Sequence, residues 1–349
     1  MASPQRSTWS RMIIVGKPFF VSRMRWRAAG ALALIVALLL TLNGLNVANS
    51  YVGRSFISAL SERHRHRYIK FALLYLGVFA ASTATGVLNQ FVQDRLALLW
   101  REWLTRQFID RYLSGHMFDW ISTKKDIDNP DQRIAEDVRT FTGTLLSFVV
   151  MMVNAGLTTI AFAGVLWSIT PVLLSAAILY AVFGSLFTVA LGYRLVHLNN
   201  QQLKKEADLR HALINLRQHP EPSSARGERV ERVESNGRRV QALLQRVIRN
   251  SRAIIGVNRN VGFFTSGYNY LVQIIPILIV APRYLRGEVE FGVVTQAAMA
   301  FAQLLGAFSL IVAQFDSIST FTAVIRRLGS LWEAMEGGPD GAWVAHSAG

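Results

Sequence analysis

The sequence lacks several residues and motifs that would point to particular chemistry. It contains no cysteine in 349 residues, which excludes disulfides, cysteine metal ligands and thiol nucleophiles. It contains no GxxxxGK[ST] motif and therefore no phosphate-binding loop of that type. We thus predict that this polypeptide is not an enzyme by itself. Charged residues make up only 17% of the chain, against about 25% in a typical soluble domain.

Long hydrophobic runs take the place of that missing charge. Hydrophobic residues make up 51% of the chain, and six segments are long enough to cross a hydrocarbon core of about 30 Å. We therefore predict an all-α integral membrane protein with six transmembrane helices. The predicted spans are residues 29–51, 71–93, 145–169, 171–196, 261–281 and 292–315.

The positive charge is distributed unevenly over the loops. If both termini lie on one side of the membrane, 30 of the 37 lysines and arginines fall on that side, many of them in two long loops at 94–144 and 194–260. Because basic residues gather in cytoplasmic loops, we predict cytoplasmic termini. This topology explains the net charge of +15 without a nucleic-acid partner. We expect a bacterial inner (plasma) membrane.

The N-terminal residues 1–27 interleave cations with aromatic side chains. Such a segment suits the membrane interface, where aromatic rings lie at headgroup depth and cations contact lipid phosphates. We therefore predict a cytosolic or interfacial elbow that contacts membrane lipid. Its cations are Arg6, Arg11, Lys17, Arg23, Arg25 and Arg27, and its aromatic residues are Trp9, Phe19, Phe20 and Trp26.

The stretch Asp128–Asp137, between the second and third spans, has the pattern of a helix start. Asn129 is a good N-cap, Pro130 suits the first helical position, and Gln132 follows the cap as in a capping box. The polar side of the helix would then carry Glu136, Asp137 and Arg139. Two interpretations stay open, namely a well-capped cytosolic helix or a coupling element that docks on a partner protein.

The run Asn-Pro-Asp-Gln-Arg-Ile followed by Glu-Asp resembles the first cytosolic loop of one branch of ABC transporter membrane domains. That branch includes the peroxisomal acyl-CoA half-transporters, the bacterial SbmA/BacA-like transporters and the vitamin B12/peptide importers. The resemblance implies a coupling role for a set of residues in this loop. They are Asp128, Asn129, Pro130, Asp131, Gln132, Arg133, Glu136 and Asp137.

Further motifs extend the resemblance over about residues 20–336. Residues 22–28 are similar to the segment before the family's first span, and residues 283–292 and 317–336 resemble its last hairpin and the exit from the membrane. Residues 205–210 resemble the EAA-like motif between the fourth and fifth spans. By this resemblance the EAA-like loop includes Glu206, Arg210, Arg217 and Gly227.

The resemblance implies an ABC exporter (type IV) membrane domain in residues 28–336, followed by a short flexible tail at 337–349 and no nucleotide-binding domain. It further implies a homodimer that moves peptide-like or amphipathic solutes by alternating access. The ATPase would be supplied by another chain or lost, so ATP and magnesium would be bound only by a partner domain. One departure is the pair Pro220 and Pro222, which should break the helix of the second coupling element.

The energy source is a second open point, since SbmA/BacA-like relatives are proton-driven and lack the ATPase. A proton relay needs carboxylates at membrane depth. All 22 acidic residues fall outside the predicted spans or at their ends, as Asp94 and Asp316 do, and the candidates for protonation are Glu288, Glu290 and Glu102. The polar residues within the spans are instead amides, which either line a cavity or form interhelical hydrogen bonds. The candidate cavity residues are Asn43, Asn46, Asn49, Asn154, Gln273, Gln296 and Gln303.

Two alternatives to an ATP-driven membrane domain therefore remain. The chain could be an ATPase-free, proton-driven peptide importer, or a truncated remnant or scaffold that binds partners without transport. The basic loop Arg63–Arg67, which also contains His64 and His66, has two interpretations as well. It is either a solvated loop or an external basic rim that attracts anionic substrate or lipid.

Overall fold

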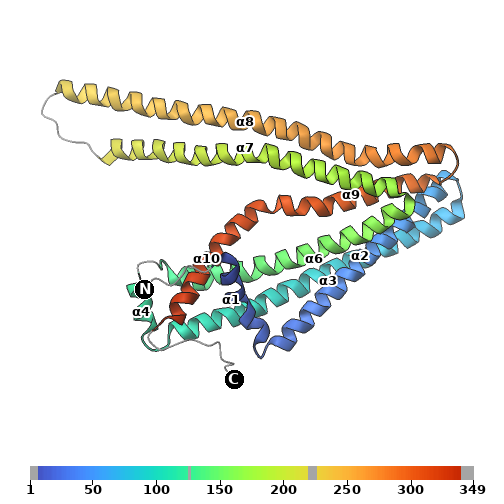
Figure 1. The fold of residues 1–349 in the computed structure, drawn as a ribbon, viewed down its shortest axis with the longest axis horizontal. Coiled ribbons are helices and arrows are strands. Elements are labelled where there is room, and N and C mark those ends of the chain that lie inside the picture. The colour runs from blue at the N-terminus through green and yellow to red at the C-terminus, as the bar shows by residue number, and fades with distance from the viewer. Residues whose placement is uncertain (1–6, 125–126, 219–225, 339–349) are drawn as a thin grey trace. The chain divides into compact units, whose positions relative to one another are not determined.

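The structure, a computed structural model, describes residues 7–124, 127–218 and 226–338, and for some helical positions within these ranges it describes only the backbone (Figure 1). Every regular element in these ranges is a helix. The chain forms two compact units. Unit 1 comprises Met1–Leu174 with Pro276–Gly349, and unit 2 comprises Ser175–Ile275.

The helices are long, as expected for a polytopic membrane protein. Their bounds are α1 Thr8–Val21, α2 Arg25–Ser61, α3 Arg65–Tyr112, α4 Met117–Thr123, α5 Pro130–Gln132, a π-helical turn η1 Arg133–Asp137, α6 Val138–Ile169, α7 Pro171–Gln218, α8 Arg226–Leu285, α9 Phe291–Ala313 and α10 Phe315–Glu336.

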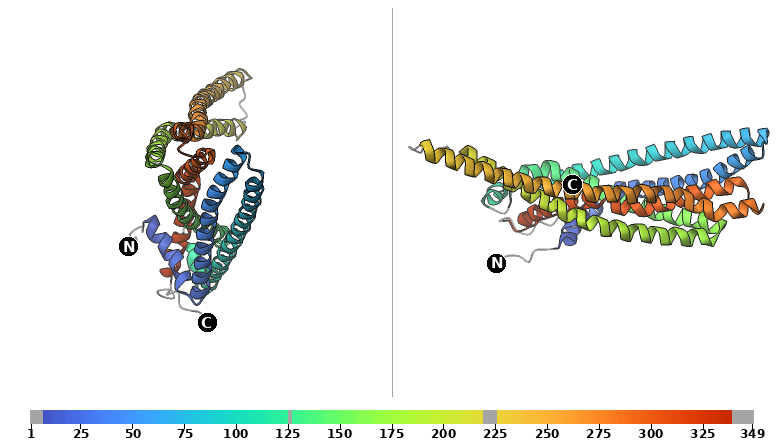
Figure 2. Two further views of the ribbon diagram at one scale, coloured as in Figure 1. Left: turned by 90° about the vertical axis from the view of Figure 1, so that its right-hand side faces the viewer. Right: turned by 90° about the horizontal axis from the view of Figure 1, so that it is seen from above.

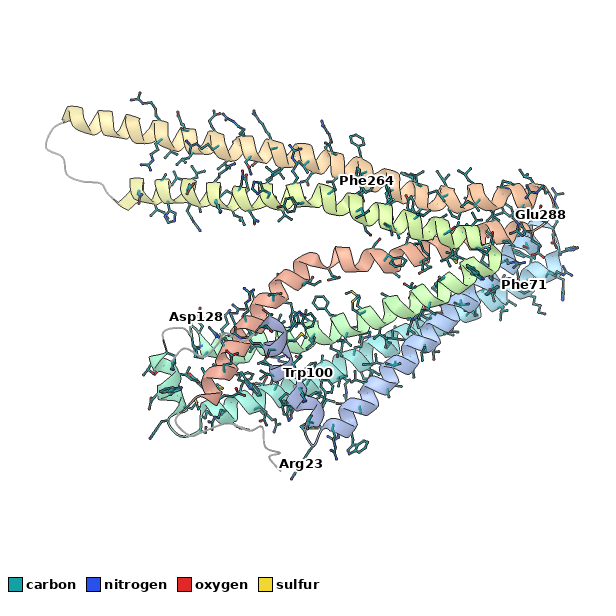
Figure 3. All side chains as sticks on the ribbon, in the orientation of Figure 1. Arg23, Phe71, Trp100, Asp128, Phe264 and Glu288 are labelled. Carbon is teal, nitrogen blue, oxygen red and sulfur yellow. The ribbon has the colours of Figure 1, made fainter. Side chains whose placement is uncertain are left out.

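Unit 1 is built around a long antiparallel pair, α2 and α3, which lie side by side in all views (Figure 2). Helix α6 packs against both, and α9 packs against α2 and α6. The tightest core lies where α1, α3, α6 and α10 meet, and Trp100 projects into it (Figure 3). The largest fully buried side chains of this core are Phe19, Leu96, Leu104, Phe108, Met117 and Phe141.

Unit 2 is an antiparallel pair formed by the parts of α7 and α8 that lie within it. The rings of Tyr180 and Tyr268 stack with centroids 4.3 Å apart, and each hydroxyl donates to the other residue's carbonyl oxygen, at 2.7 and 3.3 Å. Further along the pair, the buried Asn250 amide donates to Leu198 O and Gln202 Oε1 and accepts from Lys205 Nζ at 2.8 Å. Aromatic stacking and polar contacts thus hold the two helices together.

Within the described residues, five helices are long and apolar enough to cross a membrane, which supports five of the six predicted spans. The remaining predicted span, residues 171–196, falls in α7. Among the described side chains its apolar part is Pro171–Phe187, which lies at the lower end of the length range of about 17–25 residues for a transmembrane helix. The sixth span therefore stays a prediction.

The N-terminal elbow differs in part from the prediction. Trp9 and Trp26 are about three-quarters exposed, as expected of interfacial residues. Phe19, in contrast, is buried and stacks on Trp100 with ring centroids 5.5 Å apart, while Arg11 binds Glu333 of α10 at 2.9 and 3.1 Å. The interfacial assignment of Phe19 and Arg11 was wrong, because one face of this amphipathic helix packs into the protein.

Candidate functional site

The segment Asp128–Asp137, hereafter the coupling segment, connects α4 to α6, and Asp128 lies in the chain that leads into α5 (Figure 3). Pro130 is the first residue of α5, as predicted. Asn129 adopts the left-handed conformation, with φ 43° and ψ 62°, and its side chain makes no capping hydrogen bond. Asn129 is thus the N-cap residue, as predicted, and its carbonyl oxygen accepts from Arg133 N at 3.2 Å. The predicted side-chain cap was wrong, because that bond is made from an extended backbone, whereas Asn129 adopts the left-handed region that asparagine tolerates.

The predicted capping box is also not formed. Gln132 donates through Nε2 to Glu136 Oε2 at 3.2 Å, one turn ahead, instead of reaching back to the start of the helix. The chain continues as η1, where Val138 N donates to Arg133 O in the five-residue spacing of a π-helix. Since π-turns are often found at functional sites, this local geometry agrees with a specialised segment.

Arg133 is the centre of this segment and is 4% exposed. Its guanidinium binds the carboxylate of Asp128 and donates to Asp128 O at 3.0 Å. It also donates across to α10, to Arg327 O at 2.9 Å and Ser330 Oγ at 2.8 Å. The hydrogen bond from Arg133 lowers the pKa of the exposed Asp128 carboxyl below its ordinary value.

Asp137 forms the second bond between the coupling segment and α10. It is 3% exposed, and its Oδ1 accepts from Arg327 Nη2 at 2.5 Å. The predicted place of Asp137 on the polar side was wrong, because positions 133 and 137 lie one turn apart and both face α10. Glu136 and Arg139 are exposed, as predicted. We call Asp128, Arg133, Asp137, Arg327 and Ser330 the coupling cluster.

The other residues of the coupling segment remain accessible. Asp128, Asp131 and Glu136 are exposed and acidic, and Asp119 of α4 is exposed as well. Two large apolar side chains in the part of the chain just before the coupling segment are also exposed, Leu113 at the end of α3 at 70% and Phe118 of α4 at 54%. Together these six residues form what we call the α4–α5 surface. Carboxylates around exposed apolar side chains are a combination suited to docking a partner protein.

A groove of about 600 Å³ lies beside the coupling cluster, between α6 and the α9–α10 region. Five of its eleven lining residues carry a hydroxyl, and these residues form no motif in the sequence that would predict the groove. We call it the hydroxyl groove. It is lined by Arg139, Thr140, Gly143, Thr144, Ser147, Phe148, Met151, Gln314, Ser317, Thr320 and Phe321.

The predicted cavity amides do not form a single set. Asn43 is buried, donates to Asn154 Oδ1 at 3.0 Å and accepts from Thr158 Oγ1 at 2.8 Å, which is the interhelical hydrogen bonding given as the alternative. Gln303 and Gln273 are exposed, and Gln273 belongs to unit 2. Asn46 and Asn49 are half-buried, and Gln296 is buried. None of the seven lines the hydroxyl groove.

The EAA-like residues lie on the α7–α8 pair. Glu206 is exposed and accepts from Gln202 Nε2 at 2.8 Å, and Arg210 is exposed one turn further on. Gly227 lies in the first turn of α8, and the side chain of Arg217 is outside the described part. The two prolines predicted to interrupt this hairpin, Pro220 and Pro222, also lie outside the described residues.

The carboxylates considered for a proton relay are held in ion pairs. Glu288 accepts from Arg286 Nε at 2.6 Å and Arg283 Nε at 3.2 Å, and these bonds lower its pKa. Arg283 also donates to Ile169 O, the end of α6, at 2.8 Å. Glu290 accepts from Ser58 Oγ at 3.0 Å. These contacts fix the α8–α9 turn.

Long apolar helices joined by extended helical hairpins are typical of a polytopic membrane protein. The family comparison gives the class more closely. Residues 17–285 match the family described as ABC transporter transmembrane region 2, and the chain belongs to this family.

Three relatives illustrate the similarity. The chain is 38% identical over 338 residues to the chloroplastic ABC transporter D family member 2 of Arabidopsis thaliana, covering 96% of this chain and 47% of the relative. It is 36% identical over 319 residues to an uncharacterized ABC transporter ATP-binding protein of Synechocystis, covering 90% and 48%. It is 23% identical over 345 residues to the inner membrane ABC transporter ATP-binding protein YddA of Escherichia coli, covering 93% and 60%. The chain thus spans about half the length of the first two.

Proposed function

We propose that the chain is the membrane domain of an ABC transporter that works by alternating access and receives its driving force from an ATP-binding domain at the α4–α5 surface. The observation that carries this proposal is the division of the coupling segment into two faces. Arg133 and Asp137 fix it to α10, while Asp128, Asp131 and Glu136 stay exposed. A segment that is rigidly attached on one side and accessible on the other can transmit movement from a docked partner.

The route of the movement follows from the contacts of α10. This helix binds the coupling segment through Arg327 and Ser330, and it binds α1 through Glu333. A displacement of the α4–α5 surface would therefore move α10 and α1 together. One wall of the hydroxyl groove is formed by α10, through Ser317, Thr320 and Phe321, so the shape of the groove would change with the position of α10.

For the solute we propose a peptide-like or amphipathic molecule bound in the hydroxyl groove. Thr144, Ser147 and Ser317 offer hydroxyls that both donate and accept, as backbone amides of a peptide require. Phe148 and Phe321 offer apolar contacts in the same groove. We further propose that two copies of the chain assemble around the transport path, as a homodimer.

The driving-force proposal is tested with membrane vesicles that contain the chain together with an ABC-type ATP-binding domain. The variant Asp131→Lys with Glu136→Lys reverses two exposed charges without touching the coupling cluster. We expect solute-stimulated ATP hydrolysis to fall by about tenfold or more, because like charges would face the partner. Glu62→Lys, which changes an exposed acidic residue in the turn between α2 and α3, is the control and should keep full activity.

Wild-type hydrolysis rates in the doubly substituted protein would contradict the proposed docking surface, provided that both proteins elute as single species in size-exclusion chromatography. Phe118→Ala gives an independent measurement on the same surface. It removes an exposed ring and leaves all charges in place.

We also propose a bacterial inner membrane with both termini in the cytoplasm. The absence of cysteine from the sequence makes this direct to test, since single cysteines can be introduced without background. A membrane-impermeant maleimide should label His66→Cys in intact cells. It should label Asp131→Cys only after the cells are permeabilised, and the reverse pattern would contradict the topology.

A further inference from the structure

A second cavity of unit 1 lies away from the coupling cluster, between α2, α3 and α9. Its volume is about 270 Å³. Its walls combine apolar and aromatic side chains with four polar or charged ones, Ser50, Arg54, Thr295 and Gln296. We call it the α2–α9 pocket. It is lined by Ser50, Gly53, Arg54, Phe56, Ile57, Tyr75, Thr295, Gln296 and Met299.

Two polar side chains of this pocket are almost completely buried and have no hydrogen-bond partner among the described residues. Gln296 is 2% exposed, and both its Nε2 and its Oε1 lack a partner. Ser50 is 1% exposed, and its hydroxyl lacks a partner as well. An unsatisfied buried polar group costs about 1–3 kcal/mol, and the cost is higher at membrane depth where no bulk water can help. Something that fills the pocket would offset this cost.

The charge of the pocket selects among the molecules that could fill it. Arg54 lines it, and the nearest carboxylate, Glu290, is 3.8 Å from Arg54 Nε. That distance is longer than a hydrogen bond, so the guanidinium keeps donor capacity for a ligand. A metal cation is disfavoured by the same guanidinium, although Gln296 and Ser50 supply oxygen atoms.

The apolar side chains that line the pocket indicate the apolar part of the ligand. Phe56 and Tyr75 are near-parallel, with ring centroids 6.1 Å apart, and both face the pocket together with Met299. Aromatic and thioether groups favour contact with another aromatic ring. A volume of about 270 Å³ corresponds to roughly nine water molecules at about 30 Å³ each. This is the size of a single small ring with a short side chain.

We propose that the α2–α9 pocket binds a small aromatic carboxylate. Arg54, Ser50 and the Gln296 amide nitrogen would donate to the carboxylate, and the ring would lie against Phe56, Tyr75 and Met299. This ligand is distinct from the transported solute, since the pocket shares no residue with the hydroxyl groove. A molecule bound here bridges α2, α3 and α9 and so stabilises one arrangement of these helices.

The test is calorimetric titration of 3-phenylpropionate into the purified full chain in lipid nanodiscs, without ATP. We expect saturable binding with one site per chain. Arg54→Gln should weaken the affinity by about tenfold or more, because a charge-assisted hydrogen bond is lost. Arg63→Gln, an exposed arginine in the α2–α3 turn, is the matched control and should change the affinity less than about twofold.

A neutral analogue separates the carboxylate contact from ring burial. 3-Phenylpropanol should bind more weakly than the acid to the wild type, and its affinity should not respond to Arg54→Gln. Gln296→Leu keeps Arg54 and should also weaken binding of the acid. This variant gives a second measurement of the affinity if Arg54→Gln fails to fold. Absence of saturable binding to the wild type, or equal affinity for acid and alcohol, would overturn the proposal. Because no ATP is involved, this result is independent of the proposed transport function.

Discussion

The coupling cluster and the α2–α9 pocket are two polar regions of the same unit. They differ in whether their buried polar side chains have hydrogen-bond partners. In the coupling cluster, the buried guanidinium of Arg133 has four contacts to Asp128, Arg327 and Ser330. In the α2–α9 pocket, the buried amide of Gln296 has no partner among the described residues. The comparison teaches that all three nitrogens of the Arg133 guanidinium are bonded within the folded chain, although Oδ2 of the buried Asp137 lacks a partner among the described residues. Neither amide atom of Gln296 is bonded in this way, which is why we propose a ligand there.

The largest expected effect comes from removing the buried guanidinium of Arg133 from the coupling cluster. Arg133→Met should lower the free energy of unfolding by about 3–5 kcal/mol, because it leaves the buried Asp137 close to a single, half-exposed cation. The loss of stability is measured by thermal unfolding of the detergent-solubilised chain, with size-exclusion chromatography as the readout of the folded fraction. Arg106→Ala, which breaks the exposed pair with Glu102 on α3, is the control and should cost less than about 0.5 kcal/mol. Equal stabilities of the two variants would show that the cluster is not structural.

The next effect concerns the backbone contact beside the α2–α9 pocket. A Cβ at Gly292 would lie 2.0 Å from Arg54 O, so Gly292→Ala must push α9 away from α2. We expect a loss of about 1–3 kcal/mol in stability, measured in the same thermal assay. Gly306→Ala on the same helix meets no atom within 4 Å and should be neutral or stabilising. If both substitutions behaved alike, the close approach of α2 and α9 would be refuted.

A smaller effect sharpens the comparison directly. Gln296→Leu removes the two amide atoms that lack partners, so without ligand it should leave stability unchanged or raise it by about 1 kcal/mol. This is the opposite sign from Arg133→Met, although both replace a buried polar side chain. A clear destabilisation by Gln296→Leu would indicate that the amide already has a partner in the folded protein.

The smallest effect is a dependence on pH. The folded pKa of Asp128 is lowered by its bond to Arg133, so this bond adds stability above the ordinary aspartate pKa and loses it as pH falls through the lowered folded value. The unfolding temperature should therefore fall by a small amount below about pH 4. Asp128→Asn should remove this part of the acid response, and an unchanged response would contradict the assignment.

The sequence predicted the helical class and five spans well, because apolar runs of more than 20 residues have few alternatives. It also placed Pro130 at a helix start and Trp100 in the packing. It placed Asp137, Arg11 and Phe19 wrongly for one common reason. Each makes a contact with a distant element, α10 or α3, and the partners Arg327, Glu333 and Trp100 do not show in a local pattern.

The candidate sites were harder to predict than the spans. The hydroxyl groove is built from threonines and serines that look unremarkable in a helix, and only the packing of α6 beside α10 brings them together. Gln296 was picked out as one amide among seven. Its burial beside Ser50 and Arg54 required the crossing of α2 and α9.

The most direct test of the central claim is movement of a fluorescent proline-rich peptide across vesicles that contain the chain and an ABC-type ATP-binding domain. ATP is supplied, and a protonophore is present or absent. We predict transport that requires ATP hydrolysis, persists with the protonophore, and is lost in Asp131→Lys with Glu136→Lys. Transport that needs no ATP and is abolished by the protonophore would contradict the account and establish a proton-driven transporter instead.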